Sequence, residues 1–398
     1  MKKLLLSSSL ATIVVMALNF GFKIYFSHKI DKNALAIFYT FMDIVSVVLM
    51  FFSGFKDSLV KAYDEGEFER VFSWYLLVFL GGIVFSLGVV GVFYSALGIA
   101  APFVYFAVIT LANSVVVFVS YANAAHKNYR VMLFENLAAT LGLIVSYFVL
   151  ESFFSGFFLL FYSFLGSMTV RLVYLMVLRN FKLQFLSSRF DASVQLFLKN
   201  TLYSSLMYFF SGLFISSSSI VLLKLYNDAN VLGDFQVVVK SIFFSLVAVF
   251  VFPLNTYLFP EISKFMSQKS FDVVKSLERK IFRYLGVFFV FLLGATFFTK
   301  FAISLVFPPT YVQSYKMLNA MLPFLPFIAY TTFALNIIKG ANRFAWALIV
   351  RVIGSVVFFI TISLLYLLDF DARYIVVALD AAFVSMAGVS LYFRRRLL

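Results

Sequence analysis

Cysteine is absent from this sequence, and histidine occurs only twice in 398 residues, at His28 and His126. Without cysteine, no disulfide, thiolate nucleophile or thiolate metal ligand can form. The two histidines lie far apart in the sequence, which leaves little material for a metal cluster or a histidine-based catalytic triad. The P-loop pattern GxxxxGK[ST] is also missing, which excludes nucleotide hydrolysis by that mechanism. We therefore expect no catalytic residues, no metal and no cofactor.

Charged residues are scarce as well. They make up 13% of the chain, whereas a soluble domain carries roughly a quarter. Hydrophobic residues reach 63%, with 56 Phe and 22 Tyr, and the mean hydropathy is +0.99. So few polar groups cannot cover a water-exposed surface, so the chain is an integral membrane protein. A transmembrane helix needs about 20 apolar residues plus a short connection, so this length predicts about twelve spans.

Apolar stretches bounded by charged residues place these spans. The stretch that follows Met1 continues to Phe26 without a small-residue cleavage site, so we interpret it as the first span and not as a signal peptide. The ten-residue alternating segments of an outer-membrane barrel are not found. The predicted spans are 4–26, 34–56, 72–94, 98–120, 131–150, 153–177, 200–223, 232–258, 282–306, 315–338, 344–367 and 373–393.

Lysine and arginine are distributed unequally between the loops on the two sides of the membrane. One side carries 22 of them, the other side carries six, and four lie inside spans. Because cytoplasmic loops carry the excess of positive charge, both termini are predicted to face the cytoplasm. Topology and contact with anionic membrane lipids then account for most of the net charge of +14, and no nucleic acid is implied.

The sequence also repeats itself. The segment 31–38, DKNALAIF, matches 228–235, DANVLGDF, in its Asp, Asn, Leu and Phe at a constant offset of 197. Two halves of six spans in the same orientation follow, which is a transporter architecture with the substrate site at a central cavity between the repeats. We therefore predict an all-α polytopic fold with an N-terminal six-helix bundle over 1–180, a cytoplasmic linker over 181–199 and a C-terminal six-helix bundle over 200–398.

Three short motifs resemble one transporter family. They are the entry to span 8, Leu232-Gly233-Asp234-Phe235, its exit, Phe259-Pro260-Glu261-Ile262-Ser263, and Ile338-Lys339-Gly340-Ala341-Asn342-Arg343 after span 10. They are similar to motifs of Wzx-type flippases of O-antigen, capsule and related repeat units, in the superfamily of multidrug, oligosaccharidyl-lipid and polysaccharide exporters. The resemblance implies translocation of undecaprenyl-diphosphate-linked oligosaccharide across the bacterial inner membrane by alternating access. It also implies contact with a polysaccharide polymerase or with glycosyltransferases.

Two other functions stay open at this point. A multidrug or cation antiporter of the same superfamily favours intramembrane acids, whereas this chain has at least as many cations as acids inside its spans. A polytopic polymerase, ligase or glycosyltransferase acting on the same lipid carrier needs a sizeable outer loop. The longest outer connection predicted here, 307–314, is too short for such a site. We therefore expect a transporter and not an enzyme.

Charges inside spans are functional candidates because each is costly in the bilayer. Asp43 in span 2 and Lys240 in span 8 differ by the repeat offset, so they occupy equivalent depths with opposite charge. One interpretation places both on the cavity, paired when it is empty, with Lys240 released to a substrate phosphate. The other is a static structural pair or two unrelated groups.

Span 1 carries a stripe of polar residues that includes Asn19 and Lys23 at helical spacing, and span 7 has a softer stripe that includes Tyr208. A polar stripe faces protein or water and not lipid. We therefore count these residues as cavity candidates, although Lys23 lies near a span end and could also snorkel to the interface.

Three further charges and four prolines complete the candidates. Arg351 in span 11 is assigned to the cavity or to an interhelical pair, whereas Arg171 in span 6 is expected to snorkel. Asp380 in span 12 is a candidate for ion coupling. Proline bends helices, so hinges or static kinks are predicted at Pro253, Pro260, Pro323 and Pro326.

Overall fold

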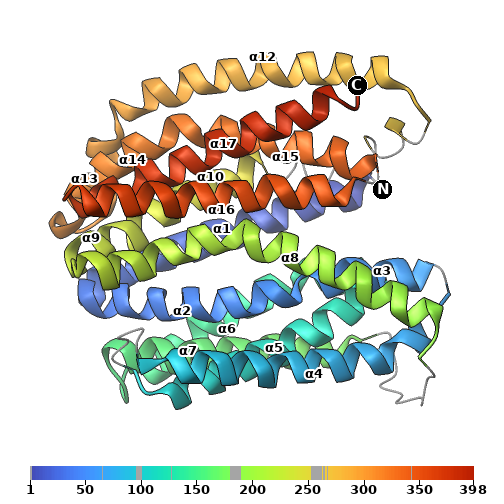
Figure 1. Cartoon of the computed structure of the whole chain (residues 1–398). Coiled ribbons are helices and arrows are strands. Elements are labelled where there is room, and N and C mark those ends of the chain that lie inside the picture. The colour runs from blue at the N-terminus through green and yellow to red at the C-terminus, as the bar shows by residue number, and fades with distance from the viewer. Residues whose placement is uncertain are drawn as a thin grey trace. The chain divides into compact units, whose positions relative to one another are not determined.

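The computed structural model of the chain describes residues 2–64, 66–95, 101–126, 128–179, 190–251, 262, 265–266, 268–341 and 343–398. Every regular element within these ranges is a helix, as Figure 1 shows. The chain divides into two compact units, an N-terminal unit, Met1–Phe209, and a C-terminal unit, Phe210–Leu398. This confirms the prediction of an all-α fold. The division lies inside one helix, shortly after the predicted linker, of which 181–189 lie outside the described ranges.

The N-terminal unit consists of six expected spans and the first part of a seventh. The α2 helix ends at Phe52, and α3 continues after a break at Ser53, so the second span and a following helix form one bent arm. The helices of the unit are α1 (Lys2–Lys29), α2 (Lys32–Phe52), α3 (Gly54–Asp64), α4 (Phe68–Phe93), α5 (Phe103–Ala125), α6 (Tyr129–Leu150), α7 (Gly156–Val177) and the start of α8 (Ala192–Val221).

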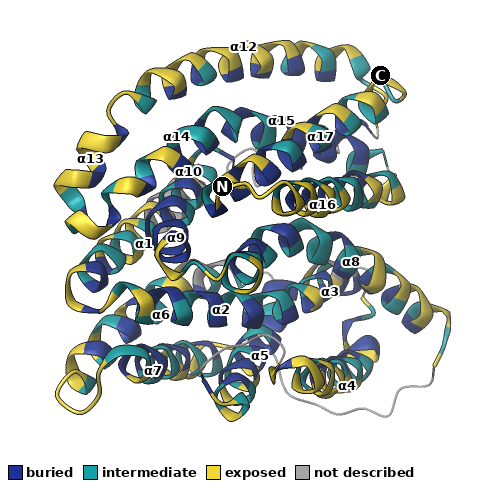
Figure 2. Ribbon diagram, turned by 60° about the vertical axis from the view of Figure 1, so that its left-hand side comes forward, coloured by how far each residue is buried: buried dark blue, intermediate teal, exposed yellow. Residues whose placement is uncertain are grey.

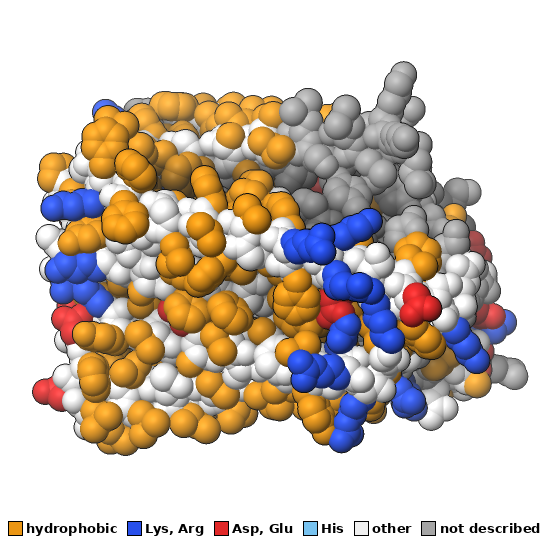
Figure 3. All heavy atoms as spheres, turned by 90° about the horizontal axis from the view of Figure 1, so that it is seen from above, with side chains coloured by type: hydrophobic (Ala, Val, Ile, Leu, Met, Phe, Trp, Pro, Cys, Tyr) orange, Lys and Arg blue, Asp and Glu red, His pale blue; other side chains and the backbone are white. Residues whose placement is uncertain are grey.

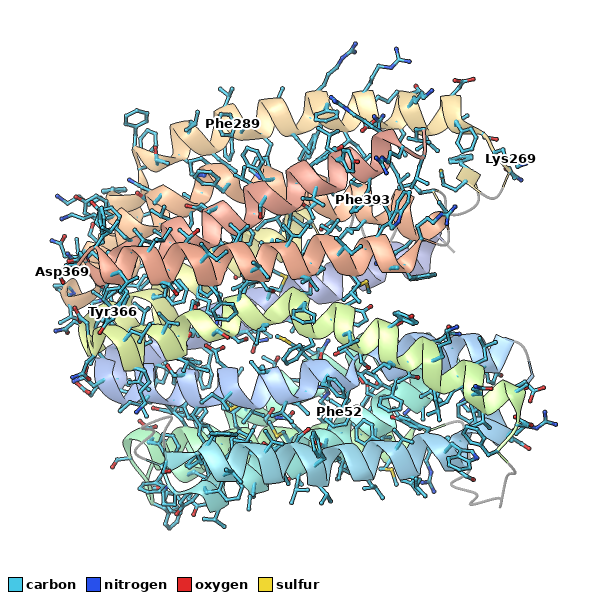
Figure 4. All side chains as sticks on the ribbon, viewed as in Figure 1. Phe52, Lys269, Phe289, Tyr366, Asp369 and Phe393 are labelled. Carbon is cyan, nitrogen blue, oxygen red and sulfur yellow. The ribbon has the colours of Figure 1, made fainter. Side chains whose placement is uncertain are left out.

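Aromatic side chains fill the core of this unit around α5. Tyr75 of α4 stacks on Phe118 of α5 at 4.5 Å between ring centroids and donates its hydroxyl to the Phe118 carbonyl at 3.1 Å. Phe52 of α2, labelled in Figure 4, packs on Phe79 of α4 at 4.8 Å. Buried rings of this size contribute most of the apolar area that a helix pair can bury, so the surplus of Phe and Tyr has a structural role.

The C-terminal unit is less regular. Two π-helical segments, η2 (Leu222–Tyr226) and η3 (Asp234–Val239), interrupt its first two spans. Its other elements are α9 (Ala229–Gly233), α10 (Lys240–Phe250), α12 (Phe271–Thr296), α13 (Thr299–Val306), η4 (Pro309–Ser314), α14 (Tyr315–Met321), η5 (Leu322–Phe324), α15 (Leu325–Gly340), α16 (Phe344–Leu367), η6 (Ala372–Tyr374) and α17 (Ile375–Arg395).

The predicted span 282–306 does not form as one straight helix. The α12 helix begins earlier, at Phe271, and a bend of 62° separates it from α13. Phe297 at this bend is 85% exposed, and Phe298 next to it is 69% exposed. The hydrophobic pattern alone did not locate this bend, because apolar residues continue on both sides of Thr299 and Lys300.

Burial separates central helices from peripheral ones in each unit, as Figure 2 shows. In the most apolar 18-residue stretch of the span Pro309–Gly340, which ends with α15, 72% of the residues are buried, whereas in that of α4 only 11% are. Large apolar side chains cover the outside of the peripheral helices, such as Phe85 of α4 at 71% and Val287 of α12 at 72% exposure. Such surfaces are stable only against lipid.

The described residues contain nine helices long and apolar enough to cross a membrane, and the bent pair α12–α13 forms a tenth candidate. The shorter apolar stretch Phe134–Leu150 of α6 and the 28-residue α1 correspond to the remaining predicted spans. The chain is therefore a multi-pass membrane protein with six helical spans or broken spans in each half.

Candidate functional site

The polar stripe predicted on span 1 meets polar groups of two neighbouring helices in the N-terminal unit. The Lys23 ammonium of α1 lies over the Tyr39 ring of α2, with 4.0 Å between Nζ and the ring centroid. One turn away on α1, the Asn19 side-chain oxygen accepts a hydrogen bond from the Thr140 hydroxyl of α6 at 3.3 Å. The stripe therefore faces α2 and α6 for at least two of its members, and Lys23 is directed toward a neighbouring helix.

Asp43 lies one helical turn after Tyr39 on α2, so the two residues share a face. Asp43 is half-buried, as is Lys23, whereas Asn19 is exposed. Lys23, Tyr39 and Asp43 therefore combine an ammonium, a phenol and a carboxylate on α1 and α2. We call these residues, with Asn19 and Thr140, the α1–α2 polar face. Ammonium and hydroxyl donors are the groups that hold phosphates and sugars.

Tyr208 belongs to α8 and is half-buried in the last part of the N-terminal unit. Nearby on α8, Thr201 and Ser205 lie against the backbone of Gly54, the first residue of α3. A Cβ atom at Gly54 would meet the Thr201 carbonyl oxygen at 2.6 Å. This close approach fixes the first half of α8 against α3 and determines which face of α8 carries Tyr208.

Lys240 is the first residue of α10 and directly follows the π-helical segment η3. A π-helical turn inserts an extra residue into the helical register, so η3 determines which direction Lys240 takes from the axis. Lys240 is half-buried, whereas every residue from Val231 to Val239 is buried.

Buried polar groups accompany this irregular segment. Gln236 of η3 donates its side-chain amide to the Ser219 hydroxyl of α8 at 2.6 Å, and the Ser241 hydroxyl donates to the Gln236 carbonyl at 3.3 Å. Gln236 is 1% exposed and Asp234 is 3% exposed. Ser219 of α8 thus provides a hydrogen-bond partner for the second span of this half. Segments of π-helix occur frequently at functional sites.

Arg351 lies at an interhelical position on α16. Its guanidinium is 3.7 Å from the Met386 sulfur of α17. Three residues further on, the same face of α16 has Gly354, where an added Cβ would collide with the Met386 side chain. Because Gly354 has no side chain, α17 can pack closely against α16, and Arg351 lies next to this contact.

Asp380 of α17 is 5% exposed, and its Oδ1 atom has no hydrogen-bond partner among the described residues. A carboxyl group buried in this way is strongly disfavoured in its charged form unless a cation or a proton compensates it. Its position on the buried face of α17 suits the ion-coupling role that remains a prediction.

The four prolines fall into two groups. Pro323 lies in the 3₁₀ segment η5, and Pro326 lies in the first turn of α15, so the helix of span 10 is interrupted at this point. Proline removes a backbone donor, which explains the change of helix type. Pro253 and Pro260 lie outside the described residues. The hinge role stays a prediction for all four.

The prediction for Arg171 is wrong. Its guanidinium forms an interhelical ion pair with Glu135 of α6, with 3.0 Å between Nη2 and Oε1. The Ser120 hydroxyl of α5 lies 3.0 Å from the other oxygen of Glu135. Glu135 is 7% exposed. Three helices thus meet at one buried carboxylate, which in the sequence is only an acid near the start of span 5.

The C-terminal unit contains a parallel arrangement that the sequence also did not reveal. Glu278 of α12 is 3% exposed and forms an ion pair with Arg394 of α17. The Tyr330 hydroxyl of α15 donates to Glu278 at 3.3 Å. In both units the arginine belongs to the sixth span and the hydroxyl to the fourth.

In the part of the chain that the structure describes, no group of three or more potential His, Cys, Asp or Glu metal ligands lies together.

No protein-family model and no curated protein matches the chain. Solved transporter structures match it over nearly its full length. An inward-facing multidrug resistance MATE family transporter of the MOP superfamily is 15% identical, covers 96% of this chain and 94% of its own, and has a TM-score of 0.71. The lipid II flippase MurJ, in an inward closed conformation, is 14% identical, with 98% and 87% covered and a TM-score of 0.74.

A third solved structure is a MOP superfamily transporter from Pyrococcus furiosus. It is 16% identical, with 100% of this chain and 96% of its own covered, and has a TM-score of 0.68. The chain therefore has the all-helical, multi-span fold of these transporters, which have about twelve transmembrane helices. The similarity to these structures concerns the fold, and it agrees with the fold that the resemblance of the three sequence motifs implies.

Proposed function

We propose that this protein is a flippase that moves an anionic, lipid-linked oligosaccharide across the bacterial inner membrane by alternating access and without nucleotide hydrolysis. Its substrate is an undecaprenyl-diphosphate-linked repeat unit of O-antigen, capsule or a related polysaccharide. The observation that carries the proposal is the α1–α2 polar face, where a half-buried ammonium, Lys23, lies over a phenol ring inside a MOP-type fold.

The chemistry of that face suits the two parts of the substrate. A lysine ammonium is a compact point charge with three donors, which is a common arrangement for phosphate binding. The Asn19 amide and the Thr140 hydroxyl, which already contact each other, are groups that exchange hydrogen bonds with sugar hydroxyls. Lys240 and Arg351 add two further cations inside spans of the C-terminal unit. A diphosphate head group requires such a surplus of positive charge.

The test is export of a surface glycan in a host whose own flippase is deleted, with the amount of this protein in the membrane measured in parallel. We expect wild-type protein to restore export and Lys23→Ala to reduce it about tenfold, as expected for one charge-assisted hydrogen bond. Lys29→Ala, at an exposed position near the end of the same helix, is the matched control and leaves export unchanged. Failure of wild-type protein in hosts with several different repeat units would contradict the proposal.

Asp380 supports a second candidate, a cation-coupled antiporter of the same superfamily, because its carboxyl group is buried with an unpartnered oxygen. Two variants, Asp380→Asn and Lys23→Ala, distinguish these two functions. If the protein exports cationic drugs, Asp380→Asn abolishes drug resistance and Lys23→Ala preserves it. If it is a flippase, Lys23→Ala impairs glycan export and wild-type protein gives no drug resistance.

A further inference from the structure

A row of aromatic rings with arginines at both ends lies where α16 begins and α17 ends. The Trp346 ring of α16 stacks on the Phe393 ring of α17 with 4.9 Å between centroids and 20° between planes. Tyr392 lies 5.6 Å from Phe393. Arg343 lies over Trp346 at 5.4 Å, and Arg396 lies over Tyr392 at 4.6 Å. Phe393 is labelled in Figure 4.

The two arginines are placed to bind an anion. When a guanidinium stacks on a ring, the ring covers its flat face, and the N–H donors stay in the plane, where they can bind phosphate oxygens in pairs. Arg343 and Arg396 are both exposed, so these donors point out of the protein. The cation–π contacts hold each guanidinium in position without neutralising its charge.

A buried ion pair keeps this row in place. Arg394, between Phe393 and the terminal arginines, pairs with the buried Glu278 of α12, which also accepts the Tyr330 hydroxyl. Its charge is thereby compensated, whereas Arg395 and Arg396 stay exposed. The end of α17 is fixed against α12 and cannot fray, so the exposed arginines are presented from an anchored helix end.

Exposed apolar side chains follow Arg343 along α16. Phe344 and Ile349 of α16 are 45% and 41% exposed. Figure 3 shows lysine and arginine side chains toward the two ends of the face it views and hydrophobic side chains over much of the surface between them. An occupant that fits both surfaces has a phosphate at one end and an acyl chain at the other. The predicted topology places this end of the helices at the cytoplasmic leaflet, which contains the anionic lipids.

We propose that Arg343, Trp346, Tyr392, Phe393 and Arg396 form a binding site for the phosphodiester head group of an anionic phospholipid in the cytoplasmic leaflet. We call it the α16–α17 lipid site. Phosphatidylglycerol is the simplest lipid of this chemistry. The site lies wholly within the C-terminal unit and is separate from the α1–α2 polar face, so it does not depend on the proposed transport function.

The chain offers a direct probe, because Trp74 and Trp346 are its only tryptophans. The Trp74→Phe variant has Trp346 as its single fluorophore, and Trp346→Phe leaves Trp74 of α4, in the other unit, as a matched control. Both are reconstituted in bilayers that contain brominated phosphatidylglycerol or brominated phosphatidylcholine, whose bromines quench a nearby indole. We expect brominated phosphatidylglycerol to quench Trp346 with at least a threefold preference over phosphatidylcholine, and Trp74 to show no such preference.

Substitutions then test the arginines in the Trp74→Phe background. Arg343→Gln with Arg396→Gln should abolish the preference, and Arg343→Lys with Arg396→Lys should weaken it, because lysine lacks the planar fork. Arg179→Gln with Lys199→Gln removes the same charge from exposed positions in the N-terminal unit and should leave the preference intact. Folding is verified from helix content and monodispersity, and the lysine pair provides the test if the glutamine pair does not fold.

Three results would overturn the site. The first is equal quenching of Trp346 by the two brominated lipids. The second is a preference that survives in the Arg343→Gln, Arg396→Gln protein or falls equally in the Arg179→Gln, Lys199→Gln control. The third is relief of quenching by millimolar soluble glycerophosphoglycerol, which would indicate a site for free phosphate esters and not for a lipid. Glycan export in the deletion host is a separate measurement, so a failed flippase proposal leaves these outcomes unaffected.

Discussion

Asp31 and Asp228, which are 197 positions apart, cap the second helix of each half through the same two bonds. The Asp31 carboxylate accepts the backbone N–H groups of Asn33 at 2.9 Å and Ala34 at 3.3 Å. The Asp228 carboxylate accepts the N–H groups two and three residues further on at 3.0 and 2.9 Å. The repeated sequence pattern therefore corresponds to a repeated local structure, since the same residue type satisfies the same orphan donors.

Removal of either cap should destabilise the protein to a similar extent. Asp31→Ala and Asp228→Ala are each expected to cost about 1 kcal/mol, because each leaves two helix N–H groups without their acceptor. Asp31→Asn and Asp228→Asn should cost much less, since asparagine is an equally good cap. The measurement is the unfolding midpoint of the purified protein in detergent. A loss confined to one of the two alanine variants would contradict the structural equivalence of the caps.

The pair Glu135–Arg171 gives a second prediction. Glu135→Ala should destabilise the N-terminal unit by about 3–5 kcal/mol, because it leaves a partly buried arginine without its counter-charge. The double variant Glu135→Leu with Arg171→Leu should recover much of that loss, because no uncompensated charge remains. Unfolding midpoints and membrane protein levels measure both effects. If the double variant is less stable than the wild type by the sum of the losses of the single variants Glu135→Leu and Arg171→Leu, the residues do not interact.

The close approach of α3 and α8 gives the third prediction. Gly54→Ala should destabilise the protein by about 1–3 kcal/mol, since its Cβ would overlap the backbone of α8 and force the helices apart. Gly81→Ala in α4 is the matched control, because no atom outside its own helix lies within 4 Å of the added Cβ. The control should be neutral or stabilising by up to about 1 kcal/mol. Equal effects of the two variants on the unfolding midpoint would exclude a tight contact at Gly54.

The fold could be predicted from the sequence because hydropathy and charge determine it directly. Apolar runs of span length locate the helices, and the repeat at Asp31 and Asp228 predicts two halves of the same orientation. The bend between α12 and α13 could not be predicted, since Phe297 and Phe298 continue an apolar run that reads as one helix. The π-helical segments of the C-terminal unit were also missed. A hydrogen bond between helices, from Gln236 to Ser219, accompanies η3, and such partners cannot be identified from the local sequence.

The site residues were predicted less completely, for a physical reason. Sequence reasoning identifies an intramembrane charge but not its partner, because partners lie on helices far apart in the chain. Arg171 was therefore assigned to snorkelling although Glu135 lies 36 positions away, and Glu278 with Arg394 received no role. Asn19 and Lys23 were selected by helical spacing alone, and the structure places both beside polar groups of other helices.

Asp43 and Lys240 give the fourth prediction. If the two residues serve one cavity, Lys240→Ala should lower glycan export about tenfold at equal protein level, since it removes a charge-assisted contact with substrate. Asp43→Ala should lower it less, and Lys240→Arg should retain part of the activity. The exchange variant Asp43→Lys with Lys240→Asp separates the two interpretations. If Asp43 and Lys240 form only a structural pair, the exchange variant should regain activity. If they bind substrate, it should regain its protein level but not glycan export.

Flipping itself is the most direct measurement of the central claim. The purified protein is reconstituted in vesicles loaded with a lipid-linked oligosaccharide diphosphate, and a membrane-impermeant glycosidase or lectin reports the fraction of sugar on the outer surface. With wild-type protein that fraction should rise from about half to nearly all as the outer pool is consumed, without added nucleotide, and Lys23→Ala should slow the rise about tenfold. A reactive fraction that stays at about half, as in vesicles without protein, would contradict the account.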